Sequence, residues 1–253
     1  LATRRGIFQP AFDAYGGLAG FIDYGPVGVK MRRRILETWR NHYVIDAGCL
    51  ELDGALIGPE ALFQASGHLG EFDDALVDCE DCSKQFRADH LIDGGEEMSR
   101  NELSKAISGM ACPSCGALLS EMTSFNLMFS TGVGAGKGLS GYLRPETAQS
   151  IFLAFPWLLR QNRGKLPFAG AQIGRSFRNE ISPRQGPLRM REFTQMEVEH
   201  FFLPNDEPQL SDDLKKITIT LLASNGKKTK STVGEAFDAD IISSSLVACH
   251  LAR

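Results

Sequence analysis

The feature that most constrains the fold of this 253-residue chain is a predicted hairpin over residues 168–202. Residues 168–180 have the composition of one strand, and residues 189–202 have that of its antiparallel partner. The loop between them contains a Ser-Pro and a Gly-Pro pair, which favour turns. Side chains near the loop should therefore come from two neighbouring strands and lie close together.

The ends of these two segments carry side chains suited to a nucleotide. Arg178 and Glu180 end the first segment, and Arg189 and Phe193 begin the second. An arginine binds phosphate with two parallel hydrogen bonds and keeps its charge, and a phenylalanine face can stack on a purine. An Arg-x-Glu triplet alone is more often an exposed cross-strand ion pair, which contributes little. The spacing of all four residues around one loop favours the nucleotide site.

Composition excludes several classes of protein. The chain is 43% hydrophobic and 23% charged, which is ordinary for one large globular domain or two smaller ones. A net charge of −4 and a pI of about 5.8 do not mark a strongly basic nucleic-acid binder. No apolar run approaches the roughly 20 residues of a membrane span, and the start lacks the apolar core of a secretory signal. We expect no membrane association and a reducing cytoplasmic compartment.

Four of the six cysteines form two C-x-x-C pairs, Cys79 with Cys82 and Cys112 with Cys115. This spacing lets both sulfurs of a pair reach one tetrahedral ion, and thiolates suit Zn²⁺. A shell of four cysteines leaves no position for a catalytic water. We therefore expect a structural zinc ion that stabilises a polar segment with little core. Reduced, unliganded thiols are the alternative, and a redox dithiol is less favoured because no thioredoxin-like context surrounds either pair.

Periodicity and turn residues predict most other elements. An amphipathic helix of roughly five turns begins at Pro26, and its apolar positions recur every four residues up to Tyr43. Residues 73–121 are more polar, carry both cysteine pairs and are interpreted as an insertion. The further elements predicted are a strand over residues 49–57, helices over residues 99–107, 146–160 and 232–253, and a turn over residues 225–228.

Residues 178–180 (RNE), followed by Arg189 and Phe193, resemble motif 2 of the class II aminoacyl-tRNA synthetases. The surrounding words resemble more specifically the glycyl-tRNA synthetases of the dimeric type found in archaea, eukaryotes and some bacteria. The segments that carry this likeness are residues 14–20 (AYGGLAG), 23–28 (DYGPVG), 65–68 (ASGH), 143–149 (LRPETAQ), 177–184 (FRNEISPR) and 191–197 (REFTQME). The resemblance implies an α+β fold, in which helices flank the class II antiparallel sheet and a zinc-binding insertion interrupts it.

The resemblance implies a two-step reaction. Glycine would attack the α-phosphate of ATP to give glycyl-adenylate, and a ribose hydroxyl of tRNA(Gly) would then take the glycyl group. Arg178 would be catalytic, and Glu180 would orient the adenine amine or a nearby water. Phe193 would stack on adenine, and Mg²⁺ would accompany the phosphates. The ATP-binding residues implied are Arg178, Asn179, Glu180, Leu188, Arg189, Met190, Arg191, Glu192 and Phe193.

Recognition of glycine would use its ammonium group and would exclude larger side chains by shape. Glu146 and Glu197 match family residues that face the ammonium, and Arg87 matches another residue on the substrate side. The structural alternatives are a helix N-terminal carboxylate for Glu146 and a strand-surface charge for Glu197. The glycine-binding residues implied are Arg87, Glu146, Phe193, Thr194, Gln195, Met196 and Glu197.

The expected domains are residues 1–72, which begin the catalytic domain, residues 73–121, the zinc-binding insertion, and residues 122–253, the core with motif 2. The helix from Pro26 and the strand after it resemble motif 1, which builds a homodimer interface in class II synthetases. We therefore expect a homodimer. Neither the third class II motif nor an anticodon-binding domain is recognised in the sequence, so we expect a truncated catalytic domain that forms adenylate poorly.

Three other interpretations compete with this one. A synthetase-like binding protein that lost catalysis would have no physical need to keep Arg178, Glu180, Phe193, Glu146 and Glu197 together. A class II synthetase for another small amino acid would prefer alanine or serine over glycine. A zinc-ribbon nucleic-acid module would explain the cysteines but nothing after residue 125, and the acidic charge balance counts against it.

Overall fold

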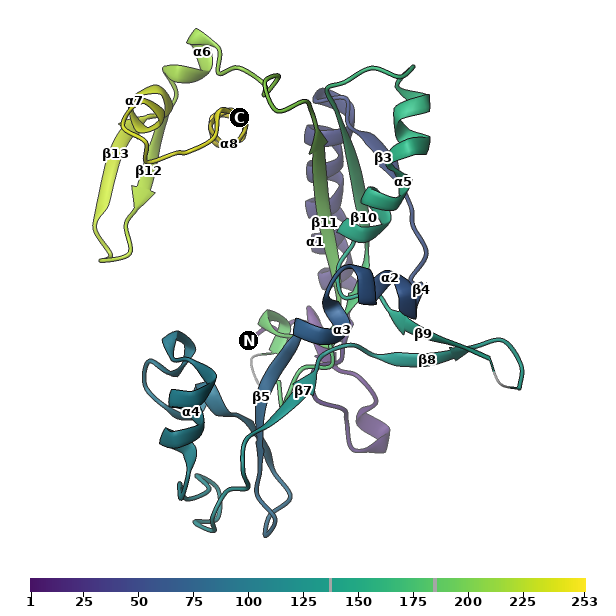
Figure 1. The fold of residues 1–253 in the computed structure, drawn as a ribbon, viewed down its shortest axis with the longest axis vertical. Helices are drawn as coiled ribbons and strands as arrows, with labels where there is room; N and C mark the ends of the chain where they lie inside the picture. Colours follow the sequence, from purple (N-terminus) through teal and green to yellow (C-terminus); the bar gives the residue numbers. More distant parts are fainter. Residues whose placement is uncertain (137, 184–185) are drawn as a thin grey trace. The chain divides into compact units, whose positions relative to one another are not determined.

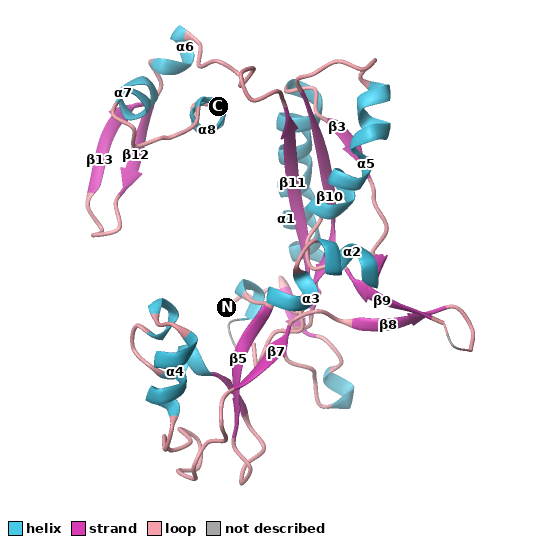
Figure 2. Ribbon diagram, in the orientation of Figure 1, coloured by secondary structure: helices cyan, strands magenta, loops and turns pink. Residues whose placement is uncertain are grey.

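The computed structural model describes residues 1–136, 138–183 and 186–253 (Figure 1). Arg184 and Gln185 of the predicted hairpin loop lie outside the described residues. The chain divides into two compact units, Leu1–Leu158 with Ala169–Glu199, and Leu159–Phe168 with His200–Arg253. Helices and strands are mixed in both (Figure 2). Within the described ranges, no helix is long and apolar enough to cross a membrane.

The predicted hairpin is present as two neighbouring ten-residue strands, β10 (Phe168–Phe177) and β11 (Glu192–Phe201). On its other side β10 pairs in parallel with β3 (Leu50–Leu52). Both strands are shorter than predicted on the side of the loop, because β10 ends at Phe177 and β11 begins only at Glu192. The backbone N–H of Asn179 turns away to the carbonyl of Leu127 at 2.8 Å, so residues 178–180 leave the strand.

Helix α1 (Pro26–Arg40) begins at the predicted proline and continues into a π-helical turn, η2 (Asn41–Asp46). Its C-terminal end and this turn pack on the sheet. The cluster that joins them consists of Cys49, Ala169 and Ala171, with Trp39, Tyr43, Val44 and Val198 around them. The first turns of α1 carry apolar side chains that this cluster does not cover.

The prediction of one strand over residues 49–57 is wrong. The segment instead contributes to two strands, β3 and β4 (Ile57–Pro59), which belong to different sheets. The break is at Gly54, whose carbonyl accepts a hydrogen bond from Arg144 Nη1 at 2.9 Å. A Cβ at Gly54 would lie 2.6 Å from Ser150 Cβ, so the backbone here is packed against helix α5 (Ala148–Gln161). Strand β4 pairs instead with β9 (Leu139–Leu143), next to β8 (Ser130–Val133).

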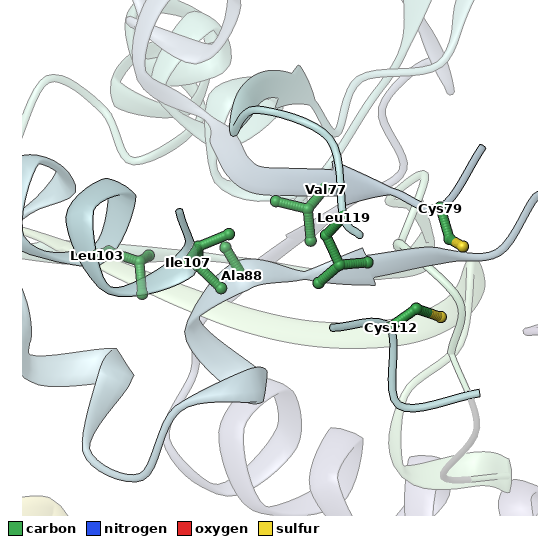
Figure 3. Packing of buried hydrophobic residues seen from close by; sticks show 7 residues of the cluster. All are labelled: Val77, Cys79, Ala88, Leu103, Ile107, Cys112 and Leu119. Atoms are coloured by element: carbon green, nitrogen blue, oxygen red, sulfur yellow. The ribbon is translucent and has the colours of Figure 1, made fainter. Parts of the chain in front are cut away.

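The polar insertion has its own sheet and its own core. Strand β5 (Asp73–Asp78) lies between β6 (Gln85–Arg87) and β7 (Thr123–Asn126). The predicted helix is α4 (Arg100–Ile107), and Ser99 and Glu102 form a capping box at its start. Figure 3 shows the core, with the sulfurs of Cys79 and Cys112 at one end of it. Its buried members are Val77, Cys79, Ala88, Leu103, Ile107, Cys112 and Leu119.

In the second unit, the predicted turn joins β12 (Thr218–Leu222) to β13 (Lys228–Thr232). The prediction of one helix over residues 232–253 is wrong. This segment forms two helices, α7 (Val233–Asp238) and α8 (Ser245–Leu251). Between them, Asp240 takes the left-handed conformation with φ of 57°.

The remaining elements are short and join these parts. They are β1 (Phe8–Pro10), η1 (Asp13–Tyr15), β2 (Ile22–Tyr24), α2 (Glu60–Ala65), α3 (His68–Glu71), η3 (Ala88–Leu91), η4 (Gly95–Glu97), η5 (Gly186–Leu188) and α6 (Asp212–Lys215).

Candidate active site

A cavity of about 640 Å³ lies in the first unit, between helix α1, the ends of β10 and β11, and the sheet of the insertion. It gathers many of the side chains proposed from the sequence. The lining residues that were proposed to bind ATP are Arg178, Glu180, Leu188, Arg189, Met190 and Phe193. Those that were proposed to bind glycine are Arg87, Phe193, Thr194 and Met196. The rest of the lining includes Tyr24, Arg32, Phe72 and Asp74.

Arg178 is held between two aromatic rings. Its guanidinium carbon lies 5.4 Å from the ring centre of Phe72 and 5.4 Å from that of Phe193. Both distances are within the range of a cation–π contact. The Nε atom also donates to the carbonyl of Pro145 at 3.2 Å. A positive charge is thus fixed in the cavity wall, where it can receive a phosphate oxygen.

Glu180 and Arg189 face each other across the same cavity. Glu180 is 8% exposed, and its Oε2 lies 3.9 Å from Nε of Arg189. Burial raises the pKa of Glu180 and the charge of Asp74 adds to this, while Arg189 and Arg87 oppose the shift. Among the described residues, no donor lies within hydrogen-bond distance of the buried Oε2 of Glu180, so this oxygen can accept a hydrogen bond from a ligand.

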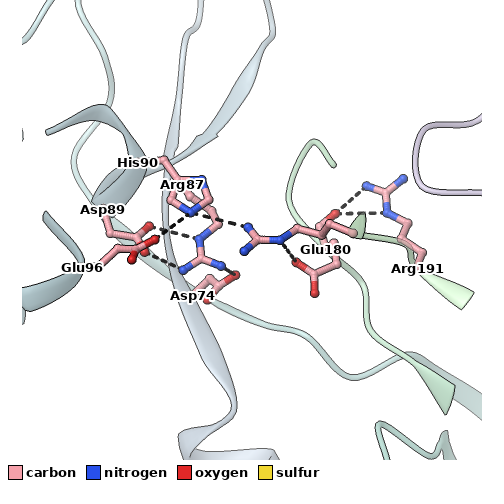
Figure 4. Close-up of polar contacts among 8 residues, drawn as sticks. Asp74, Arg87, Asp89, His90, Glu96, Glu180 and Arg191 are labelled. Atoms are coloured by element: carbon pink, nitrogen blue, oxygen red, sulfur yellow. Dashed lines mark hydrogen bonds and ion pairs between the residues drawn. The ribbon is translucent and has the colours of Figure 1, made fainter. Parts of the chain in front are cut away.

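Arg87 of the insertion lines the cavity, and its guanidinium lies between two carboxylates (Figure 4). Its Nη1 lies 3.1 Å from Oδ2 of Asp74, and its Nε donates to Oδ1 of Asp89 at 3.1 Å. Burial alone would raise the pKa of Asp89, but the hydrogen bond and charge of Arg87 outweigh burial and lower it. Burial raises the pKa of Asp74 despite the opposing charge of Arg87.

Glu146 and Glu197 lie outside the residues that line this cavity. Oε2 of Glu197 accepts hydrogen bonds from the backbone N–H of Thr147, at 2.7 Å, and from its hydroxyl. Glu146 accepts from the amide of Gln149 and lies 3.6 Å from Nε2 of His68. Burial raises the pKa of Glu199, and the negative charges of Glu197 and Glu146 raise it further.

The four paired cysteines converge on one point, and each offers its sulfur within 4.8 Å of the others. The sulfurs of Cys79 and Cys115 are 3.4 Å apart, and those of Cys82 and Cys112 are 3.7 Å apart. Sulfurs at zinc–thiolate bond length around a tetrahedral ion would be about 3.8 Å apart. Burial favours the neutral thiol of Cys112, but backbone N–H groups of Ser114 and Cys115 outweigh it and lower its pKa to about 6. The donor set therefore fits a tetrahedral metal ion.

Comparison with known proteins decides the family. The family model of the class II tRNA synthetase core domain (G, H, P, S and T) matches residues 137–245. The glycine–tRNA ligase of Methanothrix thermoacetophila is 45% identical over 100% of this chain, and that of Methanothermobacter thermautotrophicus is 42% identical over 99%. The chain belongs to the glycine–tRNA ligase family.

The chain spans about half the length of the curated relatives it matches. It covers 46% of the Methanothrix ligase and 47% of the glycine–tRNA ligase of Methanocaldococcus jannaschii, to which it is 41% identical over its full length. Among solved structures, the chain is similar to the RNA-binding domain of threonyl-tRNA synthetase from Cryptosporidium parvum. The match covers 74% of this chain and 32% of the other, with 19% identity and a TM-score of 0.46. That likeness is too weak to support an argument.

In this member of the family, two of the side chains proposed for ATP have other contacts. Arg191 donates from Nε and Nη2 to the carbonyl of Glu180 at 3.1 and 2.9 Å, and from Nη1 to the carbonyl of Ala19 at 3.1 Å. Glu192 pairs with Arg175 at 2.6 Å. Neither these two nor Asn179 is among the residues that line the cavity.

Phe72, Asp74 and Thr147 are among the residues at or beside the site that the sequence did not reveal. Asp74 could have been suspected, since the acidic pair Asp73-Asp74 opens the polar insertion next to the aromatic Phe72. Thr147 follows Glu146 directly, but nothing in its neighbourhood signals a bond to a residue 50 positions later.

Proposed function

We propose that the enzyme to which this chain belongs activates glycine with ATP and transfers the glycyl group to tRNA(Gly), and that this chain supplies the residues around the α-phosphate, the adenine and the glycine. The observation that carries the proposal is the single cavity in which Arg178, Arg189 and Arg87 meet Phe193 and Glu180. The guanidinium groups of Arg178 and Arg189 suit a triphosphate, and a ring with a carboxylate nearby suits a purine and its amine. The names of the curated relatives point to the same reaction.

The proposed chemistry needs no covalent nucleophile. A carboxylate oxygen of glycine attacks the α-phosphorus, and the bond from that phosphorus to the pyrophosphate oxygen breaks. Arg178 stabilises the charge on the α-phosphate oxygens, Arg189 binds the outer phosphates and Phe193 stacks on adenine. Mg²⁺ bound with ATP would neutralise part of the phosphate charge. The residues of this chain align the two reactants.

The carboxylates around Thr147 are proposed to bind the glycine ammonium. The negative charges of Glu197 and Glu146 both raise the pKa of Glu199 beyond the effect of its burial. An ammonium group near these carboxylates would offset their repulsion. We also propose that the cysteine cluster holds a structural Zn²⁺ ion, which the cytoplasm would favour by keeping the thiols reduced.

We further propose a homodimer through the motif 1 region. Val27, Met31 and Ile35 on α1 are 47%, 51% and 58% exposed, although they form the apolar stripe of an amphipathic helix. Ile35 also lines a hollow of about 410 Å³ with Trp39, Tyr43 and Met196, whose walls are mainly apolar. A second copy that covers this stripe would bury it.

Binding of a non-hydrolysable glycyl-adenylate analogue, measured by calorimetry, tests the proposed activity. We expect the analogue to bind the wild-type chain and to lose about 100-fold or more in affinity in Arg178→Ala, because a charged contact to phosphate is lost. Arg160→Ala, in the last turn of α5 and outside the cavity lining, is the matched control. Equal or tighter binding of the alanyl analogue would favour a synthetase for another small amino acid. Absence of binding to the wild-type chain would overturn the proposal.

A further inference from the structure

One residue supplies both hydrogen bonds that fix Glu197. Thr147 is fully buried, at 0% exposure, and its backbone N–H and hydroxyl both donate to Oε2 of Glu197. Among the described residues, no donor reaches the other oxygen, Oε1. A carboxylate with one oxygen saturated and the other available is oriented rather than free to rotate.

Thr147 is itself held by a buried network. In the amide orientation that satisfies its neighbours, Gln172 donates to the carbonyl of Thr147 at 3.3 Å and accepts from Nη1 of Arg144 at 2.6 Å. Arg144 is 3% exposed, and its Nε donates to the carbonyl of Arg175 at 2.8 Å. These hydrogen bonds link Thr147, Gln172 and Arg144, so a shift of Thr147 would leave further buried polar groups unpaired.

The neighbouring strand leaves room for this network only because it has no side chain at one point. A Cβ on Gly174 of β10 would lie 2.0 Å from Nη2 of Arg144 and 3.6 Å from Cγ2 of Thr147. The backbone of β10 therefore approaches Arg144 and Thr147 closely. The position of Thr147 relative to the sheet, and so to Glu197 on β11, is set by packing as well as by hydrogen bonds.

We propose that Thr147 is a positioning residue for amino-acid recognition, which acts by fixing the carboxylate of Glu197 toward the substrate ammonium. This inference rests on the proposed function, because it assigns Glu197 to the glycine ammonium. On the same face of β11, Gln195 carries a buried Oε1 that has no donor among the described residues. The free oxygen of Glu197 and this amide oxygen give an ammonium group two acceptors from adjacent positions on one strand face.

The role separates from ATP binding, since Thr147 and Glu197 are outside the lining of the cavity that contains Arg178. Removal of the hydroxyl should loosen one carboxylate without moving the guanidinium groups that receive phosphate. The signature is therefore a selective loss of affinity for the amino acid. A purely structural role would weaken ATP and glycine together, or neither.

The test uses Thr147→Val, which keeps the shape and the backbone N–H but removes the hydroxyl, and Thr147→Ser, which keeps the hydroxyl. Calorimetry with glycine and, separately, with ATP measures affinity on the 253-residue chain. We expect Thr147→Val to bind glycine about 10-fold more weakly, ATP to bind both variants as it binds the wild type, and Thr147→Ser to restore glycine affinity to within about 3-fold. If the valine variant does not fold, Thr147→Ala against Thr147→Ser gives the same comparison.

A double-mutant cycle shows whether Thr147 acts through Glu197. In a Glu197→Gln background, Thr147→Val should have little further effect on glycine binding. Unchanged glycine affinity in the single variant, equal losses for glycine and ATP, or full additivity in the cycle would overturn the positioning role. A wild-type chain that binds ATP but no glycine would instead refute the proposed function, so the two failures are distinguishable.

Discussion

The guanidinium of Arg87 and the carboxylate of Asp74 lie 3.1 Å apart, and both line the cavity that contains Arg178. The two residues lie on β6 and β5 of the insertion, and Arg178 follows β10. The insertion is thus more than an appendage to the sheet, because its own strands supply part of the wall. This relationship makes the integrity of the insertion a condition for the shape of the candidate active site.

Asp74→Asn should lower both stability and affinity for the adenylate analogue. The change removes one partner of a largely buried guanidinium, which we expect to cost about 1–3 kcal/mol because Asp89 still pairs with it. Urea unfolding and calorimetry measure the two effects. Asp212→Asn is the matched control, since Asp212 is 90% exposed and its pair with Lys215 should contribute little. Equal effects of the two variants would contradict the wall-forming role of Asp74.

Metal content should follow the cysteine cluster. Elemental analysis of the purified chain should give about one zinc ion per chain, and Cys112→Ser should lower it toward zero and destabilise the insertion. Cys249→Ser, at a buried cysteine of the second unit, should leave the metal content unchanged. Zinc affinity should fall as the pH falls, because protons compete for the thiolates. A Cys112→Ser variant that keeps its zinc would exclude the proposed shell.

Glu180 should make stability depend on pH in a defined direction. Burial raises its pKa in the folded chain, so the folded state binds a proton that the unfolded state has already released. The stability that this proton contributes is complete below the ordinary glutamate pKa and is lost as the pH rises through the raised value. Glu180→Gln should reduce this loss. Urea unfolding of the wild type and the variant between about pH 4 and pH 7 measures the free energy of unfolding against pH. Parallel dependences on pH in the two proteins would show that Glu180 is not the group responsible.

Arg191→Ala should loosen the N-terminal segment rather than remove a phosphate contact. The guanidinium joins the carbonyls of Glu180 and Ala19, and the backbone N–H of Arg191 reaches the carbonyl of Gly20 at 2.8 Å. Hydrogen exchange of the backbone over residues 11–21 should therefore quicken in this variant. Arg175→Ala, which breaks only a half-exposed pair with Glu192, serves as the control. ATP affinity that falls as far as in Arg189→Ala would show that Arg191 contacts the nucleotide.

Local signals predicted the elements that local interactions create. Pro26 marks the start of α1, Ser99 and Glu102 cap α4, and the Asn225-Gly226 turn joins β12 to β13, as expected from neighbours in sequence. The break at Gly54 depends on Arg144, which is 90 residues away, and no pattern around Gly54 reveals it.

Contacts between residues far apart in the sequence also limited the prediction of the candidate site. Residue types and spacing identified Arg178, Glu180, Arg189 and Phe193, and the structure brings all four to one cavity. Spacing could not show that Arg191 turns toward the backbone carbonyls of Glu180 and Ala19, the second of which lies 172 residues earlier in the chain. The domain boundaries and the individual ligand assignments stay predictions.

A crystal structure of the chain with a bound glycyl-adenylate analogue would locate the adenine, the phosphate and the ammonium in one experiment. We expect the adenine ring against Phe193, the phosphate or its replacement at Arg178, and the ammonium at Glu197. An analogue bound elsewhere, with the cavity of about 640 Å³ left empty, would contradict it.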